Sequence, residues 1–135
     1  MAVITTHQIR GIHPLTVVLR LAIVALTLAT AAIHATLGGP LFTLNAIGYT
    51  AFAIAMVLPG PFAQHRWLVR YGLIGFAAAT IAGWLAFGAR FDLAYLDKSI
   101  EVALIGLLLV ESWALDGGPI AVAKRAGRLA SSMVR

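Results

Sequence analysis

The 135-residue chain is apolar, with 61% hydrophobic residues, only 11% charged residues and a mean hydropathy of +0.93. Soluble domains are about half apolar and about a quarter charged, so this composition predicts an integral membrane protein with a single domain, residues 1–135. The lack of cysteine excludes disulfides, thiolate metal sites and thiol nucleophiles from this chain. The net charge of +5 comes from basic residues that flank apolar segments, which indicates membrane orientation rather than nucleic-acid binding.

Four apolar segments follow one another along the chain: residues 15–37, 41–58, 67–87 and 99–115. Each approaches the roughly 20 residues that cross a hydrocarbon layer as a helix, the form that pairs backbone groups internally. The polar lead before the first segment predicts an uncleaved span rather than a signal peptide. Gly- and Pro-rich turns at 38–40 and 59–61 and a longer loop at 90–98 are expected between them. The sequence therefore predicts an all-α, membrane-embedded four-helix bundle with up-down-up-down topology.

Basic residues are distributed unequally between the two ends of this expected bundle. Eight lie on the side that holds both termini and the second turn: Arg10, Arg20, Arg66, Arg70, Lys124, Arg125, Arg128 and Arg135. The other side carries only Arg90 and Lys98. Because Lys and Arg favour the cytoplasmic side, this distribution predicts a multi-pass protein of the plasma (inner) membrane with both termini in the cytoplasm.

The segment at residues 119–135 has apolar and basic residues at helical spacing. This pattern is typical of a cationic amphipathic helix that lies on anionic lipid. A charged tail that only enforces topology is an alternative that the sequence leaves open.

Polar residues inside the spans are the best functional pointers, because polar groups are costly in hydrocarbon. His34 near the end of the first span, Asn45 and Tyr49 near the start of the second, and Glu101 just inside the fourth fall at similar depth. We expect these four residues to form a polar cluster in the outer half of the bundle. The cluster could hold the helices together through interhelical hydrogen bonds, or it could form a pocket for a small ligand, a metal ion or a proton. The metal remains unknown, since His34 and Glu101 are too few for a three-ligand zinc site.

Two other patterns concern helix packing. Gly75, Ala79 and Gly83 form a ridge of small residues on the third span, which predicts a neighbouring helix at close backbone distance. Near the inner end of the fourth span, an acidic pair is expected to neutralise arginines at the same end. The residues concerned are Glu111 and Asp116 on one side and Arg20, Arg66 and Arg70 on the other.

Two short runs carry a resemblance to known proteins. LFTLNAIGY, residues 41–49, follows His34, and YLDKSIE, residues 95–101, opens the last span. Both resemble stretches of uncharacterised small bacterial four-helix integral membrane proteins, and the likeness covers the bundle core but not the termini. The resemblance implies the four-helix fold and singles out His34, Asn45, Tyr49 and Glu101. It implies no reaction, because no activity is assigned to that group.

No Walker motif, nucleophile elbow or His-Glu-x-x-His pattern occurs, which favours a non-enzymatic protein. The leading hypothesis is an accessory subunit or a lipid- or ligand-binding module of a membrane assembly. Its expected partners are the lipid bilayer and either other membrane subunits or further copies of the chain, with no nucleic acid. The alternative is a small oligomeric transporter or channel that uses His34 and Glu101. A third hypothesis is a haem- or pigment-binding protein with His34 as the single ligand, because His13 and His65 lie at other depths. The cofactor remains unknown.

Overall fold

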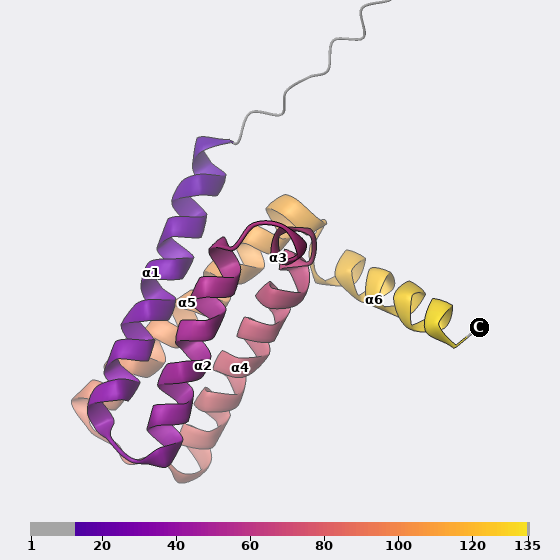
Figure 1. Ribbon diagram of the computed structural model, residues 1–135. Coiled ribbons are helices and arrows are strands. Elements are labelled where there is room, and N and C mark those ends of the chain that lie inside the picture. The colour runs from indigo at the N-terminus through magenta and orange to yellow at the C-terminus, as the bar shows by residue number, and fades with distance from the viewer. Residues whose placement is uncertain (1–12, 135) are drawn as a thin grey trace, which may run out of the picture.

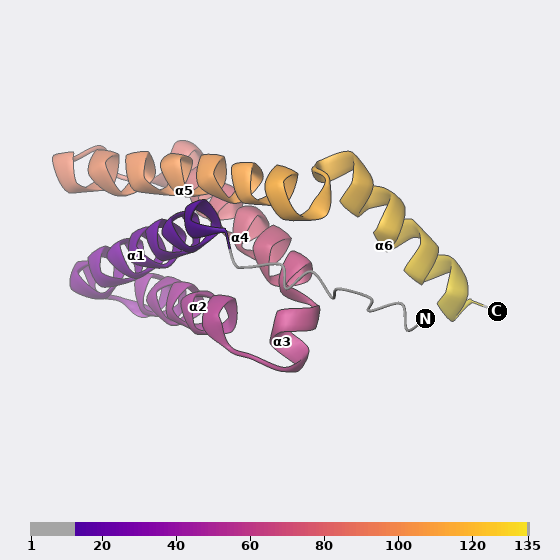
Figure 2. The same ribbon diagram turned by 90° about the horizontal axis from the view of Figure 1, so that it is seen from above.

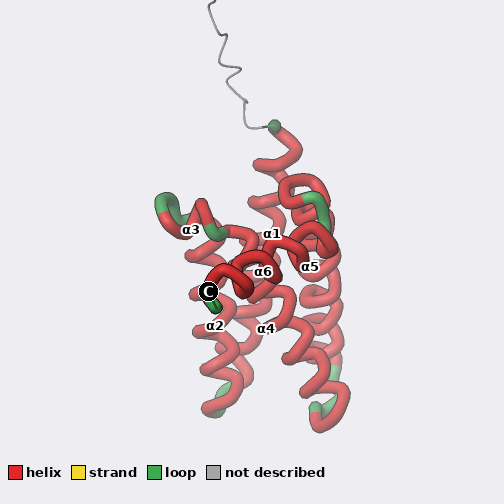
Figure 3. The backbone as a smooth tube through the Cα atoms, turned by 90° about the vertical axis from the view of Figure 1, so that its right-hand side faces the viewer, coloured by secondary structure: helices red, strands yellow, loops and turns green. Residues whose placement is uncertain are grey.

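A computed structural model describes residues 13–134, and every regular element among them is a helix (Figures 1 and 3). The order is α1 (Pro14–Leu37), α2 (Pro40–Val57), α3 (Pro61–Gln64), α4 (Arg66–Phe87), α5 (Asp92–Asp116) and α6 (Pro119–Met133). The expected all-α class is confirmed. Arg10 and Arg135, which contribute to the charge distribution, lie outside the described residues.

Proline and glycine set the helix boundaries. Four helices carry a proline in their first turn, where the missing N–H would have no intrahelical partner: α1, α2, α3 and α6. Between α1 and α2 the chain reverses at Gly38 and Gly39, whose φ angles are 71° and 88°. A side chain would strain both positions, so glycine is what allows this tight turn. The turn makes α1 and α2 antiparallel neighbours.

The four long helices lie side by side, and each contacts two of the others (Figures 1 and 2). Helix α1 packs against α2 and α5, and α4 packs against α5 and α2. The short helix α3 lies between α2 and α4, and α6 leaves the end of α5 in a different direction (Figure 2). The change of direction occurs at Gly117 and Gly118, which again have positive φ angles.

The distribution of side chains differs from that in a soluble domain, because large apolar residues cover the surface and charged residues share the interior with apolar ones. Large apolar side chains are exposed along the outer faces of the long helices, for example Leu21, Ile47, Ile54, Val102 and Val110. Buried positions instead include several polar and charged residues: Thr27, Thr30, His34, Arg70, Asp97, Glu101, Glu111 and Ser112. Such an arrangement suits a surface in contact with lipid and an interior where polar groups find partners.

Three helices, α1, α2 and α4, are long and apolar enough to cross a membrane. Helix α5 is of similar length, with 25 residues, but carries charged residues along its buried face. It begins at Asp92, seven residues before the apolar stretch expected from residue 99, so the expected loop at 90–98 is largely helical. The prediction of a loop was wrong because Asp97 and Lys98 make ion pairs and hydrogen bonds inside the helical assembly.

The ridge of Gly75, Ala79 and Gly83 lies on the side of α4 that faces away from the other described helices. All three residues are exposed, and a Cβ atom built at Gly75 or Gly83 would meet nothing within 4 Å. Within residues 13–134 the neighbouring helix is therefore not found. Helix α4 buries its opposite face, which includes Arg70 and Ala77, because the Arg70 guanidinium must reach carboxylates on α5.

Candidate functional site

Polar side chains from four helices converge near the end of the structure that holds the α1–α2 turn. We call the set the His34 cluster, and it consists of Thr30 and His34 on α1, Tyr49 on α2, Thr80 on α4, and Asp97, Lys98 and Glu101 on α5. The structure thus brings His34, Tyr49 and Glu101 together. Asn45 makes no hydrogen bond to them and lies half-buried to one side.

Glu101 is the centre of this cluster and is fully buried. Its Oε1 atom accepts a hydrogen bond of 2.7 Å from the Tyr49 hydroxyl. Its Oε2 atom accepts one of 2.7 Å from the Lys98 ammonium. A buried carboxylate is tolerated when both oxygens are paired in this way, since an unpaired buried charge is very costly.

Asp97 lies one helical turn before Glu101 and shares its cation. The Thr30 hydroxyl donates to Asp97 Oδ1 at 2.6 Å, and Lys98 Nζ lies 3.0 Å from Oδ2. One ammonium therefore bridges two carboxylates. Sequence reasoning did not place Thr30 or Asp97 in the cluster, although each is four residues from a member that it did name, and that spacing puts side chains on one helix face.

The tautomer of His34 follows from its neighbours. Nδ1 lies 2.9 Å from the Thr30 carbonyl oxygen, which can only accept, so Nδ1 carries the hydrogen. In the neutral ring Nε2 is then an acceptor, and it lies 4.0 Å from Glu101 Oε1, beyond hydrogen-bond distance. The ring also lies near two aromatic rings, with centroid distances of 6.0 Å to Phe42 and 5.6 Å to Tyr49.

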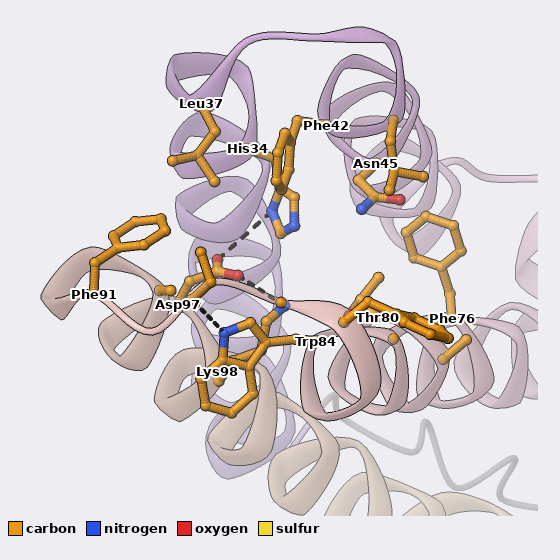
Figure 4. A pocket seen from close by; sticks show the side chains of 17 residues that line it. His34, Leu37, Phe42, Asn45, Phe76, Thr80, Trp84, Phe91, Asp97 and Lys98 are labelled. Carbon is orange, nitrogen blue, oxygen red and sulfur yellow. Dashed lines mark hydrogen bonds and ion pairs between the residues drawn. The ribbon is translucent and has the colours of Figure 1, made fainter.

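A cavity of about 420 Å³ adjoins His34 and is lined mainly by apolar side chains (Figure 4). Its walls include five aromatic residues: Phe42, Phe76, Trp84, Phe87 and Phe91. Its polar lining comes from His34, Asn45, Thr80, Asp97 and Lys98. Figure 4 shows the His34 ring and the Asn45 amide directed toward the same space. The exposed residues Ala79 and Gly83 also line the cavity, so it reaches the outer surface of α4.

Within residues 13–134, His34, Asp97 and Glu101 are the residues that could hold a metal ion, because one donor atom from each lies within 4.8 Å of the others. The Lys98 ammonium already donates to both carboxylates, at 2.7 and 3.0 Å. A divalent cation would have to displace this ammonium to bind both carboxylates. A single axial bond to haem would need only Nε2 of His34, so the hydrogen on Nδ1 is compatible with the haem hypothesis.

A second polar group, the arginine cluster, occupies the opposite end of the long helices. It consists of Arg20, Arg66, Arg70, Glu111 and Asp116. Arg20 Nε and Arg70 Nε donate to the two oxygens of Glu111 at 2.5 and 2.9 Å, and Arg70 also pairs with Asp116. The expected pairing of the acidic residues is confirmed for Arg20 and Arg70. Arg66 differs, because its Nη2 donates to the Leu58 carbonyl oxygen at 2.7 Å.

Comparison with known proteins assigns no relative: no family model, no curated protein and no solved structure matches this chain. A helical fold by itself names no function, because one fold supports many functions. The geometry of the two clusters and of the cavity beside His34 is therefore the basis for the functional proposal.

Proposed function

We propose that this protein is a four-span membrane protein that binds a small, mainly apolar molecule with a hydrogen-bonding end in the cavity beside His34. The observation that carries this proposal is the cavity itself. Its volume of about 420 Å³ falls in the range of small-molecule pockets, roughly 300–1,000 Å³, which are mostly apolar with a few converging polar groups. The walls and the polar lining described above have this composition.

The role of α5 as the fourth span is supported by how its charges are arranged. Asp97, Glu101 and Glu111 are buried and paired with residues of the protein, whereas Val102 and Val110 on the same helix are exposed. Charged residues in spans are tolerated when they face the interior and are paired. The basic residues at the α6 end favour a cytoplasmic location for that end, which would put the cavity in the outer half of the bilayer.

The cavity lining suggests what the polar end of the ligand contains. In the neutral form of His34, Nε2 offers an acceptor, and the Asn45 amide offers both a donor and an acceptor. A hydroxyl or amide group on the ligand would satisfy both residues. Access through the exposed Ala79 and Gly83 would let such a molecule enter sideways from the bilayer.

Ion transport by a single chain is less well supported. Glu101 and Glu111 belong to different clusters, and ten residues of helix place them about 15 Å apart along α5. The layer between the clusters is apolar and fully buried: Ile23, Met56, Leu73, Leu104 and Leu108. An ion would have to lose its hydration to cross this layer, which is very costly. Ligand binding is therefore preferred to conduction.

Trp84 lines the cavity and can report binding by fluorescence quenching. In a Trp67→Phe, Trp113→Phe background it is the sole tryptophan of the chain. We expect saturable quenching by a bromine-tagged long-chain alcohol, and weaker quenching by the corresponding bromoalkane, which lacks the hydroxyl. His34→Ala should reduce the affinity for the alcohol by about tenfold, because one buried hydrogen bond is lost. The affinity for the bromoalkane should not change, because it makes no such bond.

Gly83→Leu and Gly75→Leu form a matched pair for this test. Both positions are exposed on α4 with open space around the added Cβ, but only Gly83 lines the cavity. Gly83→Leu should abolish saturable quenching, whereas Gly75→Leu should retain it, and both proteins should keep the thermal stability of the parent. Equal, non-saturable quenching in all variants would show that the probe only partitions into lipid or detergent, and would contradict the proposal.

A further inference from the structure

A smaller cavity, of about 190 Å³, lies at the end of the long helices opposite the His34 cluster. Its lining includes Arg20, Arg66, Trp67, Arg70, Asp116 and Arg125. We call it the arginine cavity. It is separate from the cavity beside His34, and no residue lines both.

Positive charge exceeds negative charge around the arginine cavity. Four arginines line it, and the carboxylates that pair with them are Glu111 and Asp116. Arg20 and Arg70 make all of these ion pairs. Among the described residues, Arg66 and Arg125 pair with no carboxylate. Two positive charges are therefore left uncompensated at this cavity, which favours an anion.

Two buried hydrogen-bond donors at the same cavity also lack partners. Arg66 Nε and Trp67 Nε1 are both buried, and neither has a hydrogen bond within residues 13–134. Trp67 is only 6% exposed. Buried N–H groups are nearly always paired, so an orphaned donor needs an explanation. Both residues line the arginine cavity, so a rotation of either side chain would offer its N–H to an oxyanion there. Arginine binds phosphate oxygens in two-pronged geometry.

The composition and position of helix α6 favour a lipid headgroup as the source of the anion. Its Arg125 guanidinium lies over the Trp67 ring, 5.1 Å from the centroid, so α6 forms one side of the cavity. The helix exposes large apolar residues, such as Ile120 and Leu129, together with basic residues such as Arg128. A cationic amphipathic helix of this kind lies at the level of the lipid headgroups.

We propose that the arginine cavity binds the phosphate group of an anionic phospholipid, held by Arg66 and Arg125 and by the Trp67 N–H. The lipid tails would lie along the exposed apolar residues nearby, and the uncompensated charge would be neutralised. This site is independent of the ligand cavity beside His34. The two proposals can therefore fail separately.

The test uses the full-length protein in a neutral detergent, titrated with phosphatidylglycerol or phosphatidylcholine and followed by native mass spectrometry. Phosphatidylglycerol should bind more tightly, because the choline cation would add positive charge to a site that already has an excess. Arg125→Gln should weaken phosphatidylglycerol binding by about tenfold, as expected for the loss of a charge-assisted contact. Arg128→Gln is the matched control, since it removes the same charge from α6 outside the cavity, and it should change affinity less than about twofold.

Arg66→Lys gives a second, independent variant. It keeps the charge and a donor for the Leu58 carbonyl, but it loses the Nε donor and the planar fork, so lipid binding should fall while thermal stability is retained. Equal losses for Arg125→Gln and Arg128→Gln would overturn the site, and so would equal binding of the two lipids. A further arm uses inorganic phosphate alone: if it raises the unfolding temperature as much as phosphatidylglycerol does at equal concentration, the lipid assignment is wrong.

Discussion

The substitution Tyr49→Phe removes a single hydroxyl group from the His34 cluster and leaves the aromatic ring in place. That hydroxyl donates to Glu101 Oε1 at 2.7 Å, and Glu101 has no exposure to solvent. A hydrogen bond to a charged group contributes about 1.5–3 kcal/mol, so the free energy of unfolding should fall by about that amount. Detergent-induced unfolding in mixed micelles, followed by circular dichroism, measures this change. Tyr95→Phe is the control, because Tyr95 is exposed, and it should change stability by less than about 0.5 kcal/mol.

Combining Tyr49→Phe with Glu101→Gln tests whether the charge of the carboxylate is the cause. A neutral amide would make only an ordinary hydrogen bond to Tyr49, of about 0.5–1.5 kcal/mol. The double variant should therefore lose about 1 kcal/mol less than the sum of the two single losses. The His34→Ala, Glu101→Gln pair should show smaller coupling, because His34 Nε2 is 4.0 Å from Glu101. Additivity of the Tyr49 and Glu101 effects within about 0.3 kcal/mol would refute this account of the cluster.

Two further predictions concern the opposite cluster and the topology. Glu111→Gln leaves the Arg20 and Arg70 guanidinium groups without their shared carboxylate, so the free energy of unfolding in the same assay should fall by about 3–5 kcal/mol. The control Asp92→Asn, at an exposed position, should change this free energy little. A loss below about 1 kcal/mol for Glu111→Gln would show that the buried pairs contribute little. Cysteines introduced singly at Ser132 and Asp92 should react with a membrane-impermeant maleimide from opposite sides of the membrane, the Asp92 position from outside. Reaction of both from one side would exclude the proposed orientation.

The members of the His34 cluster were partly predictable from depth along each span. His34, Tyr49 and Glu101 are polar residues at similar depth, and antiparallel helices of similar length bring equal depths together. Asn45 shares a face of α2 with Tyr49 but lies one turn nearer the helix start, and there it lines the cavity instead of bonding to Glu101. Of the residues predicted from depth, only Tyr49 donates a hydrogen bond to Glu101, a result of side-chain length that depth alone does not reveal.

The rotation of α4 illustrates what the sequence left undecided. Its small residues Gly75, Ala79 and Gly83 predicted one buried face, whereas the expected pairing of Arg70 with an acidic residue requires a second face to be buried. The structure buries the second face, where Arg70 meets Glu111. The free energy lost by leaving such a charge unpaired in an apolar environment exceeds the small gain from close packing of glycines. Choosing between the two faces required the position of Glu111 on another helix.

Composition and segment length alone determined that the chain is helical and that its surface suits a membrane. These properties are local, because each helix pairs its own backbone groups and needs only a run of apolar residues of sufficient length. The tertiary structure alone decided that Lys98 bridges Asp97 and Glu101 and that a cavity adjoins His34. It also decided that Arg66 and Trp67 have donors with no partner within residues 13–134. Those features depend on the rotation of each helix and on how far side chains from different helices reach. Buried charges on different helices set both through their pairing, and no single segment contains both partners.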